Sequence, residues 1–173
     1  EKKAYGKGIE LQGKTLGIVG FGRIGQHLGV MAKAIGMKVI AFDIYQIPVI
    51  SEQLDIPYVE MDELLAKSDF ISVHAPAVDG GALINAERIA KMKDGVVIIN
   101  TSRGSNVDED ALLAALESGK VRAAGLDVYA DEPASNVALY SHPMVSCTPH
   151  IGAATVEAQK RIGQEIVEII AAM

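Results

Sequence analysis

The sequence predicts an α/β fold in which a doubly wound parallel β-sheet lies between two layers of helices, a three-layer αβα arrangement. One observation is that short runs rich in β-branched residues alternate along the chain with segments of helical period. A second is that these runs are almost continuously apolar. Strands buried on both faces have this composition, whereas half-exposed antiparallel strands alternate polar and apolar residues.

Six strands are expected, one at each apolar run. They cover residues 15–20, 38–43, 70–74, 96–100, 123–128 and 145–148. Helices are expected at residues 24–35, 61–67, 85–94, 108–118 and 155–173, with Asn106 or Asp108 as the cap of the fourth. The first of these helices, which ends at Gly36, has one apolar face. That face consists of Ile24, Leu28, Met31, Ala32 and Ile35.

Composition is typical of one globular domain, with 173 residues, 49% hydrophobic and 22% charged residues, and a net charge of −6. The acidic balance argues against nucleic acid or an anionic membrane as the main partner, and no apolar run has the length of a membrane span. The single cysteine, Cys147, favours a reducing compartment, and we expect a cytoplasmic protein. Cys147 itself is expected to be an inert thiol buried in the last strand.

A glycine-rich turn joins the first predicted strand to the first predicted helix. Gly20, Gly22 and Gly25 form the pattern GxGxxG. The first glycine allows the tight turn, the second lets a pyrophosphate approach the backbone, and the third lets helix and strand pack closely. The amides near Arg23 and Ile24 would meet the anion at the helix N-terminus. Any glycine-rich turn can match this pattern by chance, so its value depends on the surrounding elements.

An acidic residue at the end of the second predicted strand completes the pattern. Asp43 lies 43 − 25 = 18 residues beyond the last glycine, close to the spacing of a Rossmann-type dinucleotide site. A carboxylate there accepts hydrogen bonds from ribose hydroxyls and repels a 2′-phosphate. The sequence therefore predicts a bound NAD rather than NADP.

Three segments after predicted strands carry groups capable of chemistry. They supply Arg103, Glu132 and His150. Ligands of open α/β sheets bind beyond the carboxyl ends of the strands, so these side chains are candidates for a carboxylate anchor and an acid/base pair. That set suits oxidation of an alcohol next to a carboxylate. Taken singly, each also fits a solvated arginine, a glutamate in an exposed turn, or a histidine bonded to a loop carbonyl.

The remaining histidines are weaker candidates. His27 lies on the polar side of the first helix, and His142 precedes a proline in a loop. His74 ends the third predicted strand, where it lines the cofactor cleft or packs at the strand end. No cluster has metal-ligand spacing, and we predict no metal.

With these motifs assembled, the chain resembles the cofactor-binding domain of the D-isomer-specific 2-hydroxyacid dehydrogenases over essentially its whole length. The most specific segments are GFGRIGQ at 20–26, NTSRG at 100–104, GLDV at 125–128 with Glu132-Pro133, and TPHIGAAT at 148–155. Within the family, residues 148–159 are most similar to the branch that oxidises 3-phosphoglycerate with NAD at the start of serine biosynthesis. Glyoxylate or hydroxypyruvate reductases, and non-enzymatic NAD-sensing corepressors of the same family, remain alternatives.

The resemblance implies roles for individual residues. His150 would take the proton of the substrate hydroxyl, Glu132 would stabilise the imidazolium, and Arg103 would hold the substrate carboxylate or carbonyl. It also implies that NAD is contacted outside the glycine-rich turn and Asp43. Those contacts fall on His74, Ala75, Pro76, Thr101, Asp127, His150 and Gly152.

The resemblance further implies partners that one domain cannot supply. A substrate domain is expected from segments before Glu1 and after Met173, because family members have a second domain that closes over the cofactor and binds a small 2-hydroxy or 2-oxo acid. The uncapped last helix supports this expectation, since it aligns Ile162, Ile166, Ile169 and Met173 on one apolar face. A homodimer through this domain is also expected.

Overall fold

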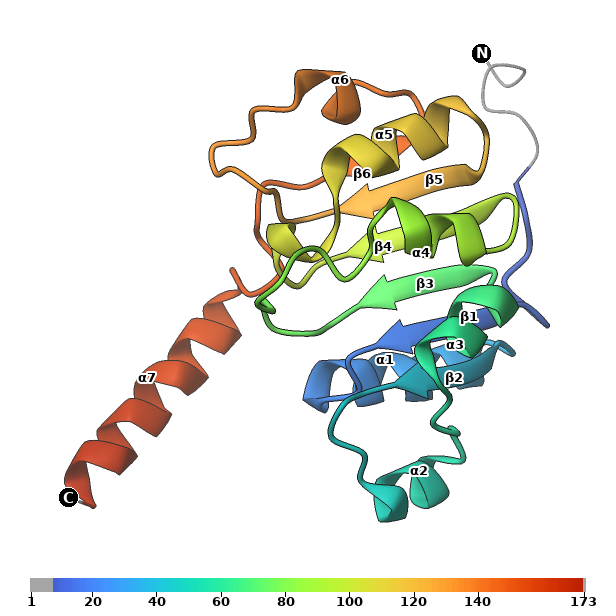
Figure 1. Cartoon of the computed structure of the whole chain (residues 1–173). Helices are drawn as coiled ribbons and strands as arrows, with labels where there is room; N and C mark the ends of the chain where they lie inside the picture. Colours follow the sequence, from blue (N-terminus) through green and yellow to red (C-terminus); the bar gives the residue numbers. More distant parts are fainter. Residues whose placement is uncertain (1–7, 173) are drawn as a thin grey trace.

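A computed structural model describes residues 8–172 and contains the predicted parallel sheet (Figure 1). Its strand order is β2-β1-β3-β4-β5-β6, and each neighbouring pair is parallel. The strands are β1 (Thr15–Val19), β2 (Lys38–Phe42), β3 (Phe70–Val73), β4 (Val96–Asn100), β5 (Val121–Leu126) and β6 (Val145–Cys147). The order reverses at β1, which confirms a doubly wound sheet. No helix of the described residues is long and apolar enough to cross a membrane.

The predicted helices are present, together with short ones that the sequence did not reveal. The helices are α1 (Arg23–Ala34), α2 (Pro48–Leu54), α3 (Met61–Lys67), α4 (Ala86–Lys91), α5 (Glu109–Glu117), α6 (Val137–Tyr140), α7 (Val156–Ala171) and the 3₁₀ turn η2 (Gly104–Asn106). Asp108, not Asn106, caps α5 by accepting a hydrogen bond from the backbone N–H of Ala111. The unpredicted α2 has seven residues, of which Ile50 and Leu54 are partly buried against the smaller core, and α6 is only four residues long, so neither is long enough to show a clear apolar period.

The two faces of the sheet have separate apolar cores. Val19 belongs to the larger core, which packs beneath α3, α4 and α5. Ile18, the preceding residue of β1, belongs to the smaller core beneath α1. Successive side chains of a strand point to opposite faces, so helices on both sides are needed to bury this sheet.

Helix α1 turns its small residues toward the sheet, and the predicted apolar face is partly wrong. Ala32 is buried as expected, but Ile24, Met31 and Ile35 are 69%, 60% and 56% exposed. The sheet-facing positions also include Gly25 and Gly29, which are buried. A Cβ on Gly29 would lie 2.7 Å from Cδ1 of Ile56. Because the helix lies this close to its neighbours, large side chains cannot occupy those positions.

The expectation that Cys147 is a buried core thiol is wrong. Cys147 is exposed, as is Ser146. β6 is a three-residue strand beside β5, and Cys147 lines a cavity with Tyr129 and Tyr140 instead of packing into a core. The apolar composition of residues 145–148 therefore does not indicate burial on both faces.

Helix α7 extends away from the domain at the carboxyl edge of the sheet (Figure 1). None of its residues is buried. Ile162, Ile166 and Ile169 of the predicted apolar face are each more than half exposed. Met173, the fourth member of that face, and Glu1 lie outside the described residues.

Candidate cofactor and catalytic site

The loops that carry the candidate residues begin side by side at one edge of the sheet. The register pairs Val19 with Phe42 and Val73, Val73 with Asn100, Asn100 with Leu126, and Leu126 with Cys147. Each of these residues is the last of its strand. The glycine-rich turn, Asp43, His74, the Arg103 loop, the Glu132 loop and the His150 loop therefore all leave the sheet at its carboxyl edge.

Close packing explains two of the three motif glycines. Gly20 has φ +94°, and a Cβ there would lie 2.6 Å from the backbone N of Ala75. A Cβ on Gly25 would overlap the carbonyl oxygen of Gly20. Gly22, at the N-cap of α1, differs from both because a Cβ there would meet nothing within 4 Å. No side chain of the described residues caps the N-terminus of α1, so its backbone N–H groups are free to bind an anion. The open space beside Gly22 leaves room for a pyrophosphate there.

Asp43 is bound to the glycine-rich turn. Its Oδ2 accepts a hydrogen bond of 2.6 Å from the backbone N–H of Phe21, and its Oδ1 accepts one of 2.9 Å from that of Tyr45. A cavity of about 340 Å³ lies beside this carboxylate. The predicted cofactor residues that line it are Gly20, Gly22, Asp43, His74, Ala75 and Pro76. This cradle of glycine backbone, carboxylate and apolar walls fits the adenosine and pyrophosphate parts of a dinucleotide.

The other predicted cofactor residues do not line this cavity. Arg23 and Thr101 are exposed, as is Ile24. Asp127 and Gly152 lie on the β5 and β6 side of the sheet and contact each other, with the Gly152 N–H donating to Oδ2 of Asp127 at 2.8 Å. Sequence reasoning missed Tyr45, which lines the cavity two residues after Asp43.

His74 is partly buried beneath the cavity. Its Nε2 lies 2.8 Å from the hydroxyl of the buried Ser72. Burial lowers the pKa of His74, so its imidazole is neutral at neutral pH. Among residues 8–172 no group of three or more His, Cys, Asp or Glu side chains is arranged to hold a metal ion.

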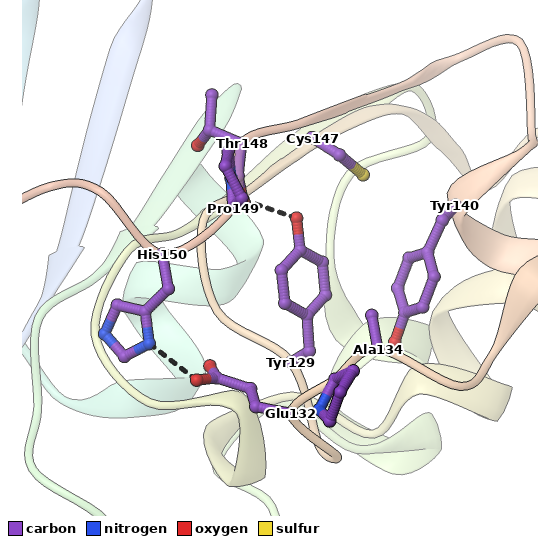
Figure 2. A pocket seen from close by; sticks show the side chains of 9 residues that line it. Tyr129, Glu132, Ala134, Tyr140, Cys147, Thr148, Pro149 and His150 are labelled. Atoms are coloured by element: carbon purple, nitrogen blue, oxygen red, sulfur yellow. Dashed lines mark hydrogen bonds and ion pairs between the residues drawn. The ribbon is translucent and has the colours of Figure 1, made fainter.

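His150 and Glu132 form a hydrogen-bonded pair (Figure 2). Nδ1 of His150 donates to Oε2 of Glu132 at 2.8 Å, and both side chains are partly exposed. The hydrogen bond to His150 lowers the pKa of Glu132, so the carboxylate stays ionised. Nδ1 then carries a proton, and Nε2 of the neutral imidazole is the atom able to accept another. The arrangement is that of a general base supported by a carboxylate.

Asp127 organises the loop that carries His150. It is 5% exposed, and its carboxylate accepts hydrogen bonds from the Thr148 hydroxyl and from the backbone N–H groups of Ile151 and Gly152. Burial alone would raise the pKa of Asp127, but these hydrogen bonds outweigh it and lower the pKa. His150 has φ +54°, a left-handed conformation that a non-glycine residue adopts only where its surroundings impose it.

Arg103 is exposed, and a network of buried amides holds its backbone. The Asn100 side chain donates to the carbonyl of Arg103 at 2.9 Å. The Asn106 side chain donates to the carbonyl of Ala75 at 2.8 Å and to the hydroxyl of Ser102 at 3.1 Å. Asn106 therefore links the cofactor loop after β3 to the Arg103 loop. From the sequence, neither asparagine has a predicted role in the site: Asn106 is expected only as a possible helix cap, and Asn100 only as the last residue of a strand and the first of the NTSRG segment.

The structure thus forms two groups of predicted residues. One is the cavity beside Asp43. The other is the His150–Glu132 pair, which borders a separate cavity of about 470 Å³ with Tyr129 and Tyr140. Arg103 lines neither, but its neighbour Gly104 packs directly against the backbone of Tyr129, so the Arg103 and Glu132 loops are in contact.

The family follows from a comparison with known proteins. Residues 1–152 match the model of the family described as D-isomer specific 2-hydroxyacid dehydrogenase, NAD binding domain. The chain belongs to this family. Its members are NAD-dependent oxidoreductases, and this chain is their NAD-binding domain. The predicted family, fold and cofactor are confirmed.

Relatives within the family act on different substrates. A hydroxypyruvate reductase of Thermotoga maritima is 53% identical over 98% of this chain and 56% of its own length. A D-3-phosphoglycerate dehydrogenase of Mycobacterium leprae is 48% identical over 98% of this chain and 32% of its own length. The structure of a D-lactate dehydrogenase of Aquifex aeolicus complexed with NAD and lactic acid has a TM-score of 0.86 and 37% identity, covering 99% of this chain and 58% of that one. The chain therefore spans from about a third to just over half of these relatives.

The position of Asp43 gives a prediction for cofactor choice. Asp43→Ser should weaken NADH binding about tenfold, because hydrogen bonds to a charged acceptor contribute about 1.5 to 3 kcal/mol. It should also narrow the preference for NADH over NADPH, since the carboxylate that repels a 2′-phosphate is removed. Calorimetric titration with both cofactors measures these changes. Unaltered NADH affinity would contradict the assignment of Asp43 to the ribose.

The His150–Glu132 pair should depend on pH in a defined direction. The pKa of Glu132 is lowered in the folded chain, so the bond to His150 stabilises the fold above the ordinary glutamate pKa and is lost as pH falls through the lowered value. The titration of the Glu132 carboxyl carbon, followed by ¹³C NMR, should shift upward in a His150→Ala variant, which has no side-chain donor for the carboxylate. An identical titration in both proteins would show that the bond is absent in solution.

Proposed function

We propose that this chain is the cofactor-binding and acid/base-bearing part of an enzyme that oxidises a 2-hydroxyacid with NAD. The observation that carries the proposal is the His150–Glu132 pair at the same sheet edge as the dinucleotide cradle. An ionised glutamate bonded to Nδ1 leaves Nε2 as the base. Membership of the family supports this assignment but does not by itself identify the residues.

In the proposed reaction, side chains of this chain transfer the proton, whereas the hydride goes to the cofactor. NAD supplies the hydride acceptor when it is bound. Nε2 of His150 takes the proton of the substrate hydroxyl as the C–H bond on the same carbon loses its hydride, which yields a 2-oxo acid. Glu132 stabilises the resulting imidazolium, and the guanidinium of Arg103 holds the substrate carboxylate. In the reverse direction His150 returns the proton.

We propose that a second domain completes the substrate site. The relatives from Thermotoga maritima and Mycobacterium leprae are longer than this chain, and Ile162, Ile166 and Ile169 of α7 expose apolar side chains that a further domain would cover. A homodimer through this domain and a cytoplasmic location are part of the same proposal. Analytical ultracentrifugation of the full-length protein tests the dimer.

For the substrate, we propose 3-phosphoglycerate, which would place the enzyme in serine biosynthesis. The segment 148–159 supports this choice, as does the Mycobacterium leprae relative. Hydroxypyruvate is the second candidate, because the Thermotoga maritima reductase is the more identical of the two relatives described above. Compared as 2-oxo acids, the two candidate substrates, 3-phosphohydroxypyruvate and hydroxypyruvate, differ by a phosphate, so the choice between them depends on groups that would bind that phosphate.

A direct comparison of the two substrates on the full-length protein tests this proposal. We expect kcat/KM for 3-phosphoglycerate oxidation with NAD, measured at alkaline pH, to exceed that of its unphosphorylated analogue glycerate. A higher kcat/KM for hydroxypyruvate reduction than for reduction of its phosphorylated form would transfer the assignment to a reductase. Saturable NADH binding with no turnover of either acid would favour a corepressor-like NAD sensor.

A further inference from the structure

The loop that carries Glu132 has little packing of its own. Residues 130–135 are all exposed, and burial ends at Val128. An exposed loop does not hold a side chain within hydrogen-bond distance of a partner unless fixed contacts restrict its backbone. The 2.8 Å bond between Glu132 and His150 therefore needs an anchor near the start of this loop.

Two residues, Glu109 of α5 and Gly104 of η2, contact the peptide unit between Tyr129 and Ala130. Oε1 of Glu109, the first residue of α5, accepts a hydrogen bond of 2.8 Å from the backbone N–H of Ala130. On the carbonyl side, a Cβ on Gly104 would overlap the Tyr129 oxygen, so the backbones are in direct contact there. The peptide is thus restricted from both sides, two residues before Glu132.

The Glu109 carboxylate is itself fixed. The hydroxyl of Tyr140 donates to both of its oxygens at 2.8 Å. Burial, and then the Glu109 carboxylate, raise the pKa of Tyr140, so the hydroxyl remains a donor at physiological pH. Tyr140 in turn packs edge to face on Tyr129, with ring centroids 4.8 Å apart. Glu109 therefore lies in a rigid setting, unlike the loop that it contacts.

We propose that Glu109 is a positioning residue that holds the Glu132 loop through the Ala130 N–H and so keeps the Glu132 carboxylate against Nδ1 of His150. The inference rests on the proposed roles of Glu132 and His150, but its structural content is independent of cofactor and substrate. Glu109 touches neither His150 nor the cavity beside Asp43. It acts through the loop backbone.

The test is the titration of Glu132 in Glu109→Ala, followed by ¹³C NMR of the chain without cofactor. We expect the lowered pKa of Glu132 to rise toward the ordinary glutamate value, and amide exchange at Ala130 to accelerate about tenfold because its hydrogen bond is lost. The sign is diagnostic. Removal of a nearby negative charge alone would lower the pKa of Glu132 further, whereas loss of positioning raises it.

Two matched variants complete the test. Glu109→Gln keeps an acceptor for the Ala130 N–H and should preserve the Glu132 titration. Asp110→Ala removes an exposed carboxylate from the same helical turn and should also preserve it. An unchanged Glu132 pKa in Glu109→Ala would overturn the proposal, as would an equal rise in Glu109→Gln.

Should Glu109→Ala fail to fold, Tyr140→Phe serves as the second variant, because it removes the hydroxyl that fixes the Glu109 carboxylate. A raised Glu132 pKa with faster amide exchange at Ala130 in Tyr140→Phe supports the positioning role, and an unchanged pKa overturns it. NADH titration of each folded variant separates this proposal from the proposed function. The variants should bind NADH as the unmodified chain does, whereas failure of the unmodified chain to bind would count against the proposed function alone.

Discussion

A His150→Asn variant of the full-length protein should lose about 10²- to 10⁴-fold in kcat for 2-hydroxyacid oxidation, the usual contribution of a general base. Asparagine can donate its amide N–H to Glu132 but cannot accept a proton at neutral pH. The loss should fall on kcat rather than on the affinity for NADH, because His150 borders a different cavity from the one beside Asp43. Stopped-flow measurement of the hydride-transfer step would isolate the effect from product release.

His142→Asn provides the matched control. His142 lies in the loop before β6, where its Nδ1 accepts a hydrogen bond from the backbone N–H of Met144. Its replacement should leave kcat within about twofold, since surface substitutions away from a site have small effects. If His150→Asn retained more than a tenth of the kcat, His150 would not be the base.

A Gly22→Val variant should bind NADH about 10- to 100-fold more weakly and yet unfold at nearly the same temperature. A Cβ on Gly22 meets nothing within 4 Å of the protein, so valine is accommodated by the fold. Its side chain would instead occupy the space at the N-terminus of α1 where a pyrophosphate would lie. Overpacking of such a contact costs about 1 to 3 kcal/mol, and each 1.4 kcal/mol is tenfold in affinity.

Gly25→Val gives the contrasting result. A Cβ there overlaps the Gly20 carbonyl, so this variant should lose stability as well as NADH binding. Differential scanning calorimetry and NADH titration of both variants separate the two roles. Equal destabilisation by the two substitutions would show that Gly22 is a packing position and not part of a cofactor cradle.

The sequence was sufficient to predict the sheet and to place the candidate site residues after the carboxyl ends of its strands. Buried parallel strands have a continuous apolar composition. A glycine-rich turn between a strand and a helix, with Asp43 after the next strand, is compatible with few folds other than a dinucleotide-binding fold. The same reasoning failed at α1 and β6. Periodicity identifies the apolar side of a helix, but the close contact of Gly25 with Gly20 leaves Ile24 exposed, and Cys147 lines a cavity instead of a core.

The supporting contacts of the site were the least predictable part. Glu109 and Asn106 act through hydrogen bonds to the backbone atoms of Ala130 and Ala75, 21 and 31 residues away in the sequence. No local pattern encodes such a pairing, because it depends on which loops the sheet places together. The candidate reactive residues were easier to select because histidine, glutamate and arginine have few roles at the end of a buried strand.

The central claim is that this chain binds NAD at the glycine-rich turn and holds the hydrogen-bonded pair of His150 and Glu132 at the same edge of the sheet. Isothermal titration of residues 1–173 with NADH, paired with amide chemical shifts, tests that claim most directly. We expect saturation at one site, with the largest shift changes at Gly20, Gly22 and Asp43. Absence of saturable heat at millimolar NADH, or shift changes confined to other parts of the chain, would contradict it.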